Sequence, residues 1–269
     1  MHDDVTYYRH VVLVGYDDME PLSGITLKLR AFHAMLRLFP EYRESAVLLQ
    51  VAIPLHDARG MLAYPEYVDQ VQDLVDDINL SYPGAVVMMK KKMSFTERVA
   101  LFSNADILVN CAVRHGLSLV PFEFVLARLA ASDALGAADH ARSTASAAPG
   151  GPGGEGKMSA EAKWSSSMRG CKFGTLILSE FTACSHVIPG AMRTNPWREE
   201  ECARVFIKSL RQPAHERQHW QEQQLAWCRH NTVFRWAENI LTDMKVSLSL
   251  SLSLSLSLCM YVYIVCMCT

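Results

Sequence analysis

Short apolar runs alternate along the chain with longer stretches in which apolar residues recur every three or four positions, and this alternation constrains the fold most. The runs lack polar alternation, which indicates strands buried on both faces of a sheet. Strands separated by helices are typical of a parallel, doubly wound α/β sheet. Strands are expected at 11–17, 45–54, 84–89, 105–113 and 173–181, with a short one within 190–197.

Helices are expected between the strands, at 24–39, 66–79, 94–104 and 121–132. Ser94 and Glu97 match the capping box that begins many helices. Ligands in sheets of this type bind beyond the carboxyl ends of the strands. The first loop, 15–24, and the second loop, 113–121, are therefore the expected binding loops.

The composition changes abruptly at residue 131. Residues 131–172 are rich in Ala, Gly and Ser, which predicts a flexible insertion within one lobe made of 1–130 and 173–245. Residues 246–269 form a low-complexity tail that begins with strict Ser-Leu alternation. Its period of two does not suit a membrane helix. A CT-dinucleotide repeat encodes strict Ser-Leu alternation, so we interpret the tail as translated repetitive DNA and not as a membrane anchor.

The charge balance excludes two classes of partner. The chain has 26 basic and 28 acidic side chains, which gives no electrostatic case for nucleic acid or an anionic membrane. Its eight cysteines form no CxxC pair, so neither a disulfide framework nor a zinc cage is expected. The N-terminus is polar and acidic, unlike a signal peptide, and we expect a cytoplasmic protein.

Two motif matches are interpreted as coincidences. The stretch GPGGEGKM, 151–158, nearly matches a phosphate loop, but Met158 replaces the hydroxyl that would bind magnesium, and no strand precedes it. HERQH, 215–219, matches the HExxH zinc motif, but its surroundings are polar and no third ligand is evident. A solvated helix face is the simpler interpretation, and no metal or cofactor is expected.

The first loop combines features that conflict. A strand, a glycine-containing loop and a helix are a common way to hold a phosphate. This loop, however, contains Asp17, Asp18 and Glu20 and no basic residue. Its charge would repel the ligand that its outline suggests.

Five stretches of the chain resemble trehalose-6-phosphate synthases, glycosyltransferase family 20, most closely the plant-type class, whose members are often non-catalytic. They are VGYDDMEPLSGITLKLRAF, VLLQVAIP, ADILVNCAVRHGLSLVPFEFVLAR, LILSEFTACSHVIPGAMRTNPW and FRWAENILTDM. They occur in the family's order and spacing, apart from the insertion.

The resemblance implies a GT-B fold, in which two Rossmann-like lobes face each other. The C-terminal lobe binds UDP-glucose and the N-terminal lobe brings glucose 6-phosphate, for a metal-independent glucosyl transfer with retention. This chain resembles only the C-terminal lobe. An N-terminal lobe supplied elsewhere, or an active synthase, is therefore a possible partner.

The resemblance also implies roles for the residues of the first loop. Catalytic members read GVDRLDYxKGI there, and the Arg and Lys clamp the diphosphate of UDP. Aligned on Gly15, Asp17 and Gly24, these cations fall on Asp18 and Ser23. Both positions are therefore degenerate.

The second loop reads RHGLSLVPFE where the family reads RDGMNLVxxE. The carboxylate that contacts the donor glucose falls on His115, a third degenerate position. Glu123 would accept the two ribose hydroxyls, and the backbone after Gly116 would meet the donor. The implied donor-binding residues are Gly116, Ser118, Leu119, Val120 and Glu123.

Several functions stay open at this point. The first is a non-catalytic, synthase-like protein that binds UDP-glucose weakly or not at all. The alternatives are a fragment of an active synthase, or the product of a decayed or mispredicted gene. A structural interpretation of the loops also stays open, in which Gly24 only lets the chain turn, Glu123 only complements a helix dipole and His115 has no role.

Overall fold

The computed structural model describes residues 11–129 and 173–247. The predicted insertion and the Ser-Leu tail beyond residue 247 lie outside these ranges. The chain divides into two units, of which the first ends at Leu225 and the second begins at Ala226.

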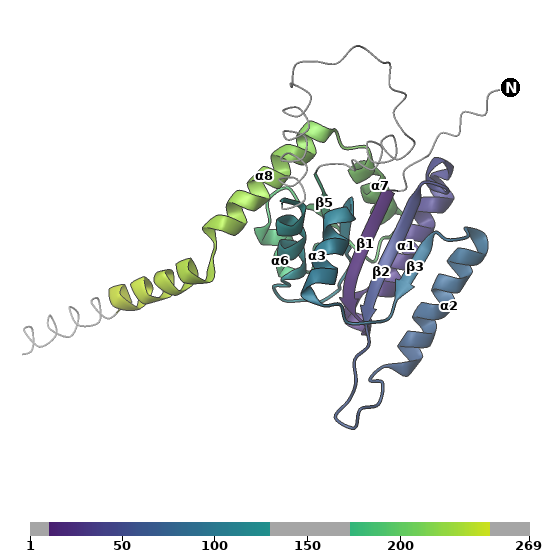
Figure 1. Cartoon of the computed structure of the whole chain (residues 1–269), viewed down its shortest axis with the longest axis horizontal. Helices are drawn as coiled ribbons and strands as arrows, with labels where there is room; N and C mark the ends of the chain where they lie inside the picture. Colours follow the sequence, from purple (N-terminus) through teal and green to yellow (C-terminus); the bar gives the residue numbers. More distant parts are fainter. Residues whose placement is uncertain (1–10, 130–172, 248–269) are drawn as a thin grey trace, which may run out of the picture. The chain divides into compact units, whose positions relative to one another are not determined.

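Six parallel strands form a single sheet in the order β3-β2-β1-β4-β5-β6 (Figure 1). The strands are β1 Val11–Asp18, β2 Ala46–Ile53, β3 Val86–Met89, β4 Ile107–Asn110, β5 Thr175–Ser179 and β6 Met192–Thr194. β1 pairs with β2 over its whole length and with β4 on the other side. The predicted parallel α/β fold is confirmed.

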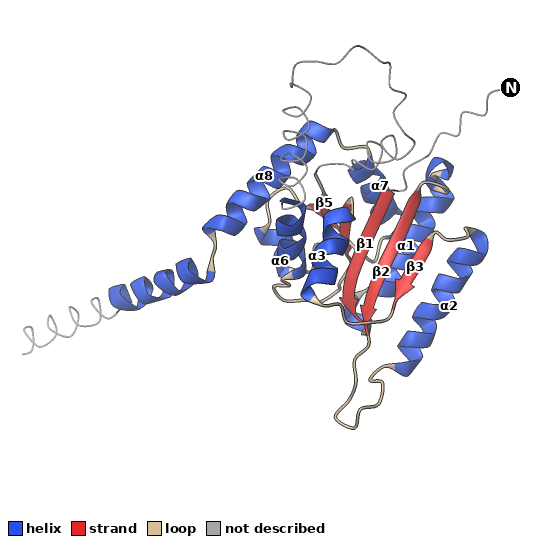
Figure 2. Cartoon of the chain, viewed as in Figure 1, coloured by secondary structure: helices blue, strands red, loops and turns tan. Residues whose placement is uncertain are grey.

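Helices connect the strands, as Figure 2 shows. They are η1 Pro21–Ser23, α1 Ile25–Leu38, η2 Pro40–Tyr42, α2 Pro65–Ser81, α3 Phe95–Asn104, the helix at 120–129, α6 Ala183–Val187, α7 Glu199–Leu210 and α8 Ala214–His230. Residues 233–247, in the second unit, are also helical. α1 leads from β1 to β2 and α3 leads from β3 back to β4, so right-handed crossovers place them on opposite faces of the sheet.

The main apolar core lies between the sheet and α1, which packs against both α2 and α7. α1 buries Leu29, Phe32 and Met35 completely, and each such side chain contributes about 1.5–3 kcal/mol of hydrophobic stabilisation. The capping box of α3 is present. The Ser94 hydroxyl accepts from the Glu97 amide at 3.3 Å, and the Glu97 carboxylate accepts from the Ser94 amide at 2.8 Å.

Candidate functional site

The first and second loops lie side by side at the carboxyl edge of the sheet. Gly24 adopts φ 68°, and a Cβ at this position would clash with the carbonyl oxygen of Cys111. The Val113 amide donates to the Leu22 carbonyl at 3.0 Å. The expected strand, loop and helix around Gly24 are therefore present, and only glycine fits where the two backbones meet.

Asp17 faces the interior and not the loop surface. Its carboxylate accepts from the Lys28 ammonium at 2.5 Å and from the Gln50 amide at 2.9 Å. The ammonium also donates to the Gln50 carbonyl at 3.0 Å. Lys28 and Gln50 have no solvent exposure, and a side chain at Gly15 would clash with both. One of the three acids in the first loop is thus neutralised within the fold.

The two positions implied for the diphosphate clamp differ in exposure. Asp18, the last residue of β1, is exposed, so its negative charge faces solvent at the rim of the first loop. Ser23, in η1, is only 3% exposed. The side chain of a lysine at this position would have to pass between packed neighbours. The sequence alone does not indicate that this position is buried.

The second loop begins at the end of β4 and is open to solvent over 114–117. His115 is exposed and its backbone forms a parallel bridge with that of Thr182, which follows β5. A Cβ at Gly116 would meet no atom within 4 Å, so the surface beside it is unobstructed. Leu117 and Leu119 are also largely exposed.

Hydrogen bonds fix the part of the second loop that leads into the helix at 120–129. The Ser118 hydroxyl accepts from the Val120 amide at 3.3 Å, and the Ser118 carbonyl accepts from the Cys184 thiol at 3.2 Å. Burial raises the pKa of the Cys184 thiol, so it is a donor at neutral pH. α6 thereby holds the backbone on which the resemblance places the donor.

Glu123 lies in the first turn of that helix and pairs with Arg98 of α3. Arg98 Nε donates to Glu123 Oε2 at 2.9 Å, and Nη2 donates to Oε1 at 3.1 Å. This is a two-point contact between a guanidinium and a carboxylate, the strongest common form of ion pair. The carboxylate implied to bind ribose therefore already has a partner within the chain.

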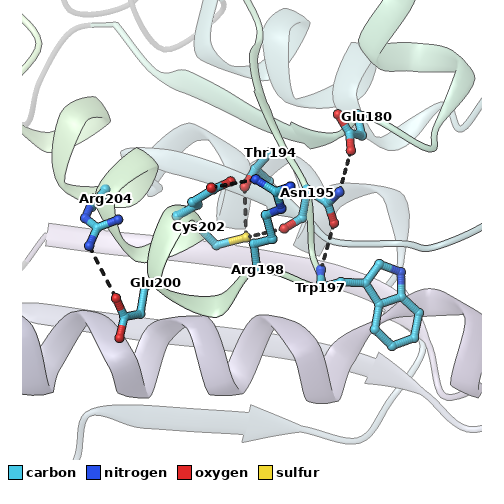
Figure 3. A network of polar contacts seen from close by, with 9 residues as sticks. Glu180, Thr194, Asn195, Trp197, Arg198, Glu200, Cys202 and Arg204 are labelled. Carbon is cyan, nitrogen blue, oxygen red and sulfur yellow. Dashed lines mark hydrogen bonds and ion pairs between the residues drawn. The ribbon is translucent and has the colours of Figure 1, made fainter.

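A polar network holds the turn between β6 and α7 at the same edge of the sheet (Figure 3). The Asn195 amide donates to Glu180 at 2.7 Å, and its carbonyl accepts from the Trp197 backbone amide at 3.1 Å. The thiol of Cys202 donates to the Asn195 backbone carbonyl at 3.0 Å. The network presents Trp197, which is 64% exposed. A hollow of about 570 Å³ lies beside it, lined by residues that include Pro21, Arg30, Tyr67, Val113 and Trp197.

The zinc-like motif gains no support from its neighbours. His215, Glu216 and His219 lie on α8, and the His219 ring packs edge-on against Trp220 at 5.2 Å between centroids. Within 11–129 and 173–247, no three His, Cys, Asp or Glu side chains gather as a metal site would require. Among the helices that the structure describes, none has the length and apolarity to cross a membrane.

The structure brings the two predicted loops together but adds two residues that sequence reasoning missed. Lys28 is a charged residue on the apolar face of α1, and this break in the apolar pattern, 11 positions after Asp17, is a detectable signal. Arg98 offered no such signal, because it lies 25 positions from Glu123. The pairing depends on how α3 packs beside the helix at 120–129.

The sequence matches one known family over most of its length. The sequence model for glycosyltransferase family 20 matches residues 5–246. Alpha,alpha-trehalose-phosphate synthase (UDP-forming) 6 of Arabidopsis thaliana is 30% identical over 241 residues, which cover 88% of this chain and 25% of that protein. The alpha,alpha-trehalose-phosphate synthase (UDP-forming) of Yarrowia lipolytica is 26% identical, with 87% of this chain and 42% of that protein covered.

Solved structures agree with the fold. An alpha,alpha-trehalose-phosphate synthase (UDP-forming) from Burkholderia xenovorans, in complex with glucose-6-phosphate, has a TM-score of 0.66 at 22% identity over 88% of this chain and 44% of that one. The N-terminal domain of a Candida albicans trehalose-6-phosphate phosphatase has a TM-score of 0.65 at 23% identity, over 88% and 42% of the two chains.

The chain thus spans between a quarter and somewhat under half of the length of these proteins. The resemblance seen in the loops and strands is confirmed at the level of the family, whereas the plant-type class stays a prediction. Since the family match extends over residues 5–246, the chain belongs to glycosyltransferase family 20.

Proposed function

We propose that this chain is a trehalose-6-phosphate synthase-like protein that binds UDP-glucose weakly or not at all and is non-catalytic by itself. In this proposal residues 1–130 and 173–245 form the UDP-sugar-binding lobe. The observation that supports it is the charge of the first loop. Asp18 is exposed where the resemblance implies a cation, and the nearby Lys28 is committed to Asp17.

The expected effect on the donor is large. A charge-assisted hydrogen bond contributes roughly 1.5–3 kcal/mol, so two absent cations remove about 3–6 kcal/mol. This corresponds to about 10²–10⁴ in affinity. The same positive charge would stabilise the leaving diphosphate as the glycosyl bond breaks, so its loss lowers the rate of transfer as well as binding.

Calorimetric titration with UDP and UDP-glucose tests this proposal. The natural chain is compared with the double variant Asp18→Arg, Ser23→Lys, which restores the implied clamp. We expect the variant to bind UDP at least about tenfold more tightly. Since Ser23 is almost buried, Asp18→Arg alone is a second variant that avoids a packing cost there.

A matched control separates the loop from net charge. Asp77 and Ser81 are both exposed at the C-terminal end of α2. Asp77→Arg with Ser81→Lys changes the net charge by the same amount, and UDP affinity should not change. Equal gains in both double variants, or no gain in either, would contradict the proposal.

The partner that we propose is an active synthase or a separate N-terminal lobe, because the residues that bind glucose 6-phosphate in the family belong to that lobe. Adding the chain to an active synthase should change the rate of UDP release and yield co-elution of the two proteins. Failure to co-elute at micromolar concentration would contradict it. The four cysteines in the described ranges are free thiols, which supports a reducing, cytoplasmic location.

The second candidate is a fragment of an active synthase. It is favoured by the retained Gly116, Leu119, Val120 and Glu123 and by the small share of each relative that the chain spans. Tight binding of UDP-glucose by the natural chain, with no further gain in the Asp18→Arg variants, would select this candidate.

A further inference from the structure

The pair formed by Arg98 and Glu123 is partly shielded from water. The two side chains are 20% and 28% exposed, and both carboxylate oxygens accept from the guanidinium. The hydrogen bonds that Arg98 donates to the Glu123 carboxylate raise the pKa of Arg98 above its ordinary value. The contact is therefore a defined element of the site, and not one of the mobile ion pairs common on surfaces.

Arg98 is held from other directions as well. Its Nη1 donates to the Met93 carbonyl at 3.2 Å, in the loop after β3. The guanidinium carbon lies 5.9 Å from the ring centres of both Tyr16 and Phe95. These contacts orient the guanidinium fork toward Glu123.

The fork and a ribose need the same atoms. A carboxylate has about four acceptor positions, two on each oxygen, and a two-point contact uses the position on each oxygen that faces the donor pair. Two adjacent hydroxyls that bind both oxygens at once require that same facing pair. Arg98 and a vicinal diol therefore compete for Glu123.

We propose that Arg98 is a specificity-determining residue of the donor site, because it occupies the face of Glu123 that a ribose diol would need. A uridine nucleotide must displace the guanidinium before its ribose can bind. This inference rests on the proposed function, in which Glu123 belongs to a UDP-sugar site. In this inference Arg98 hinders the ribose contact, and this effect is independent of the missing cations at Asp18 and Ser23.

The test is calorimetric titration of the whole chain with UDP and with 2′,3′-dideoxyuridine diphosphate, which lacks the diol. For the natural chain the two ligands should bind within about twofold of each other, since the diol finds no free acceptor. Arg98→Met removes the fork and keeps an apolar stem beside Tyr16. We expect it to bind UDP about fivefold more tightly, with no gain for the dideoxy ligand.

Arg211→Met is the matched control. Arg211 also joins two elements, donating to Glu41 at 3.0 Å with its guanidinium 5.9 Å from the Phe39 ring. Phe39 and Glu41 follow the C-terminal end of α1, and Arg211 follows α7, whereas the first loop precedes the N-terminal end of α1. UDP affinity should be unchanged in this variant. An equal gain there would overturn the proposal.

Other outcomes are also decisive. Weaker UDP binding by Arg98→Met would show that the guanidinium positions Glu123 for ribose, and would overturn the competition. A natural chain that prefers UDP more than about fivefold over the dideoxy ligand would do the same, even if the variant does not fold. A gain in Asp18→Arg, Ser23→Lys without a gain in Arg98→Met overturns this inference alone. No UDP binding by any chain overturns the proposed function and this inference together.

Discussion

A lysine ammonium without access to water must find its countercharge inside the protein. Lys28 does so by contacting Asp17 and Gln50 beneath the first loop. Asp17 and Gln50 bond each other as well, so each member of the group has two partners in it. The arrangement turns an acid that would repel phosphate into a structural residue at the end of β1.

Replacing Lys28 by methionine should lower the free energy of unfolding by about 3–5 kcal/mol, because Asp17 would stay buried without its cation. Denaturant unfolding followed by circular dichroism measures the loss. The double variant Asp17→Asn, Lys28→Met should recover much of it, since no buried charge is left. Strictly additive losses would show that the pair is not coupled.

Gly24→Ala tests the contact between the two loops. The substitution combines a positive φ with a clash against the Cys111 carbonyl, and we expect a loss of more than about 2 kcal/mol in unfolding free energy. Gly60 has φ 78° but open space around a Cβ, so Gly60→Ala provides the control and should cost about 1 kcal/mol. Equal losses would mean that only the backbone angle matters.

At the scale of the elements, Glu97 in the capping box of α3 has a shifted pKa. Lys91, and then the amide of Ser94, lower the pKa of Glu97 to about 2. A carboxyl whose pKa is lower in the folded state than in the unfolded state stabilises the protein fully at pH values above the unfolded pKa, here 4.5. This contribution to stability is lost as the pH falls toward 2.

Glu97→Gln should therefore reduce the melting temperature at pH 7 by about 2 °C, and the difference from the natural chain should shrink below pH 4.5. Thermal melts between pH 7 and pH 3 measure it. Lys91→Met should produce a similar loss at neutral pH, because it removes the same contact. A difference that stays constant down to pH 3 would contradict the assignment.

The strands and the α3 cap could be predicted because their signals are local. The apolar runs and the capping box each lie within about ten residues, and the structure confirms both. The ends of a strand depend on its neighbours. The predicted strand at 105–113 is longer than β4, Ile107–Asn110, because the residues after Asn110 leave the sheet to meet the first loop. The partners of Asp17 and Glu123 are distant in the sequence, so they could be identified only from the way the helices and strands pack.

At the scale of the whole molecule, the first and second loops, the Arg98 pair and the Trp197 turn belong to the first unit, at the carboxyl edge of one sheet. The main apolar cluster also lies within this unit, between Leu13 and Ile207. The helix at 233–247, in the second unit, exposes Phe234 and Trp236. Stability and the proposed donor site are therefore both properties of the first unit.

Removal of 232–269 should leave the unfolding free energy of the first unit unchanged within about 0.5 kcal/mol, because every core residue that the structure describes lies before residue 232. Urea titration of the shortened and the complete chain measures this. A drop beyond that range would mean that the deleted residues stabilise the sheet domain. Normal stability with unchanged UDP titration would locate the donor site in the first unit alone.

The glycine at the contact of the two loops has a consequence for any redesign of the proposed donor site. Gly24 rests on the Cys111 carbonyl, and Leu22 accepts from Val113, so neither loop can shift without the other. Mutant libraries for a glucosyl donor pocket should therefore vary 18–23 and 111–118 jointly. If only one segment is varied, the unchanged segment in contact with it restricts which substitutions can be accommodated.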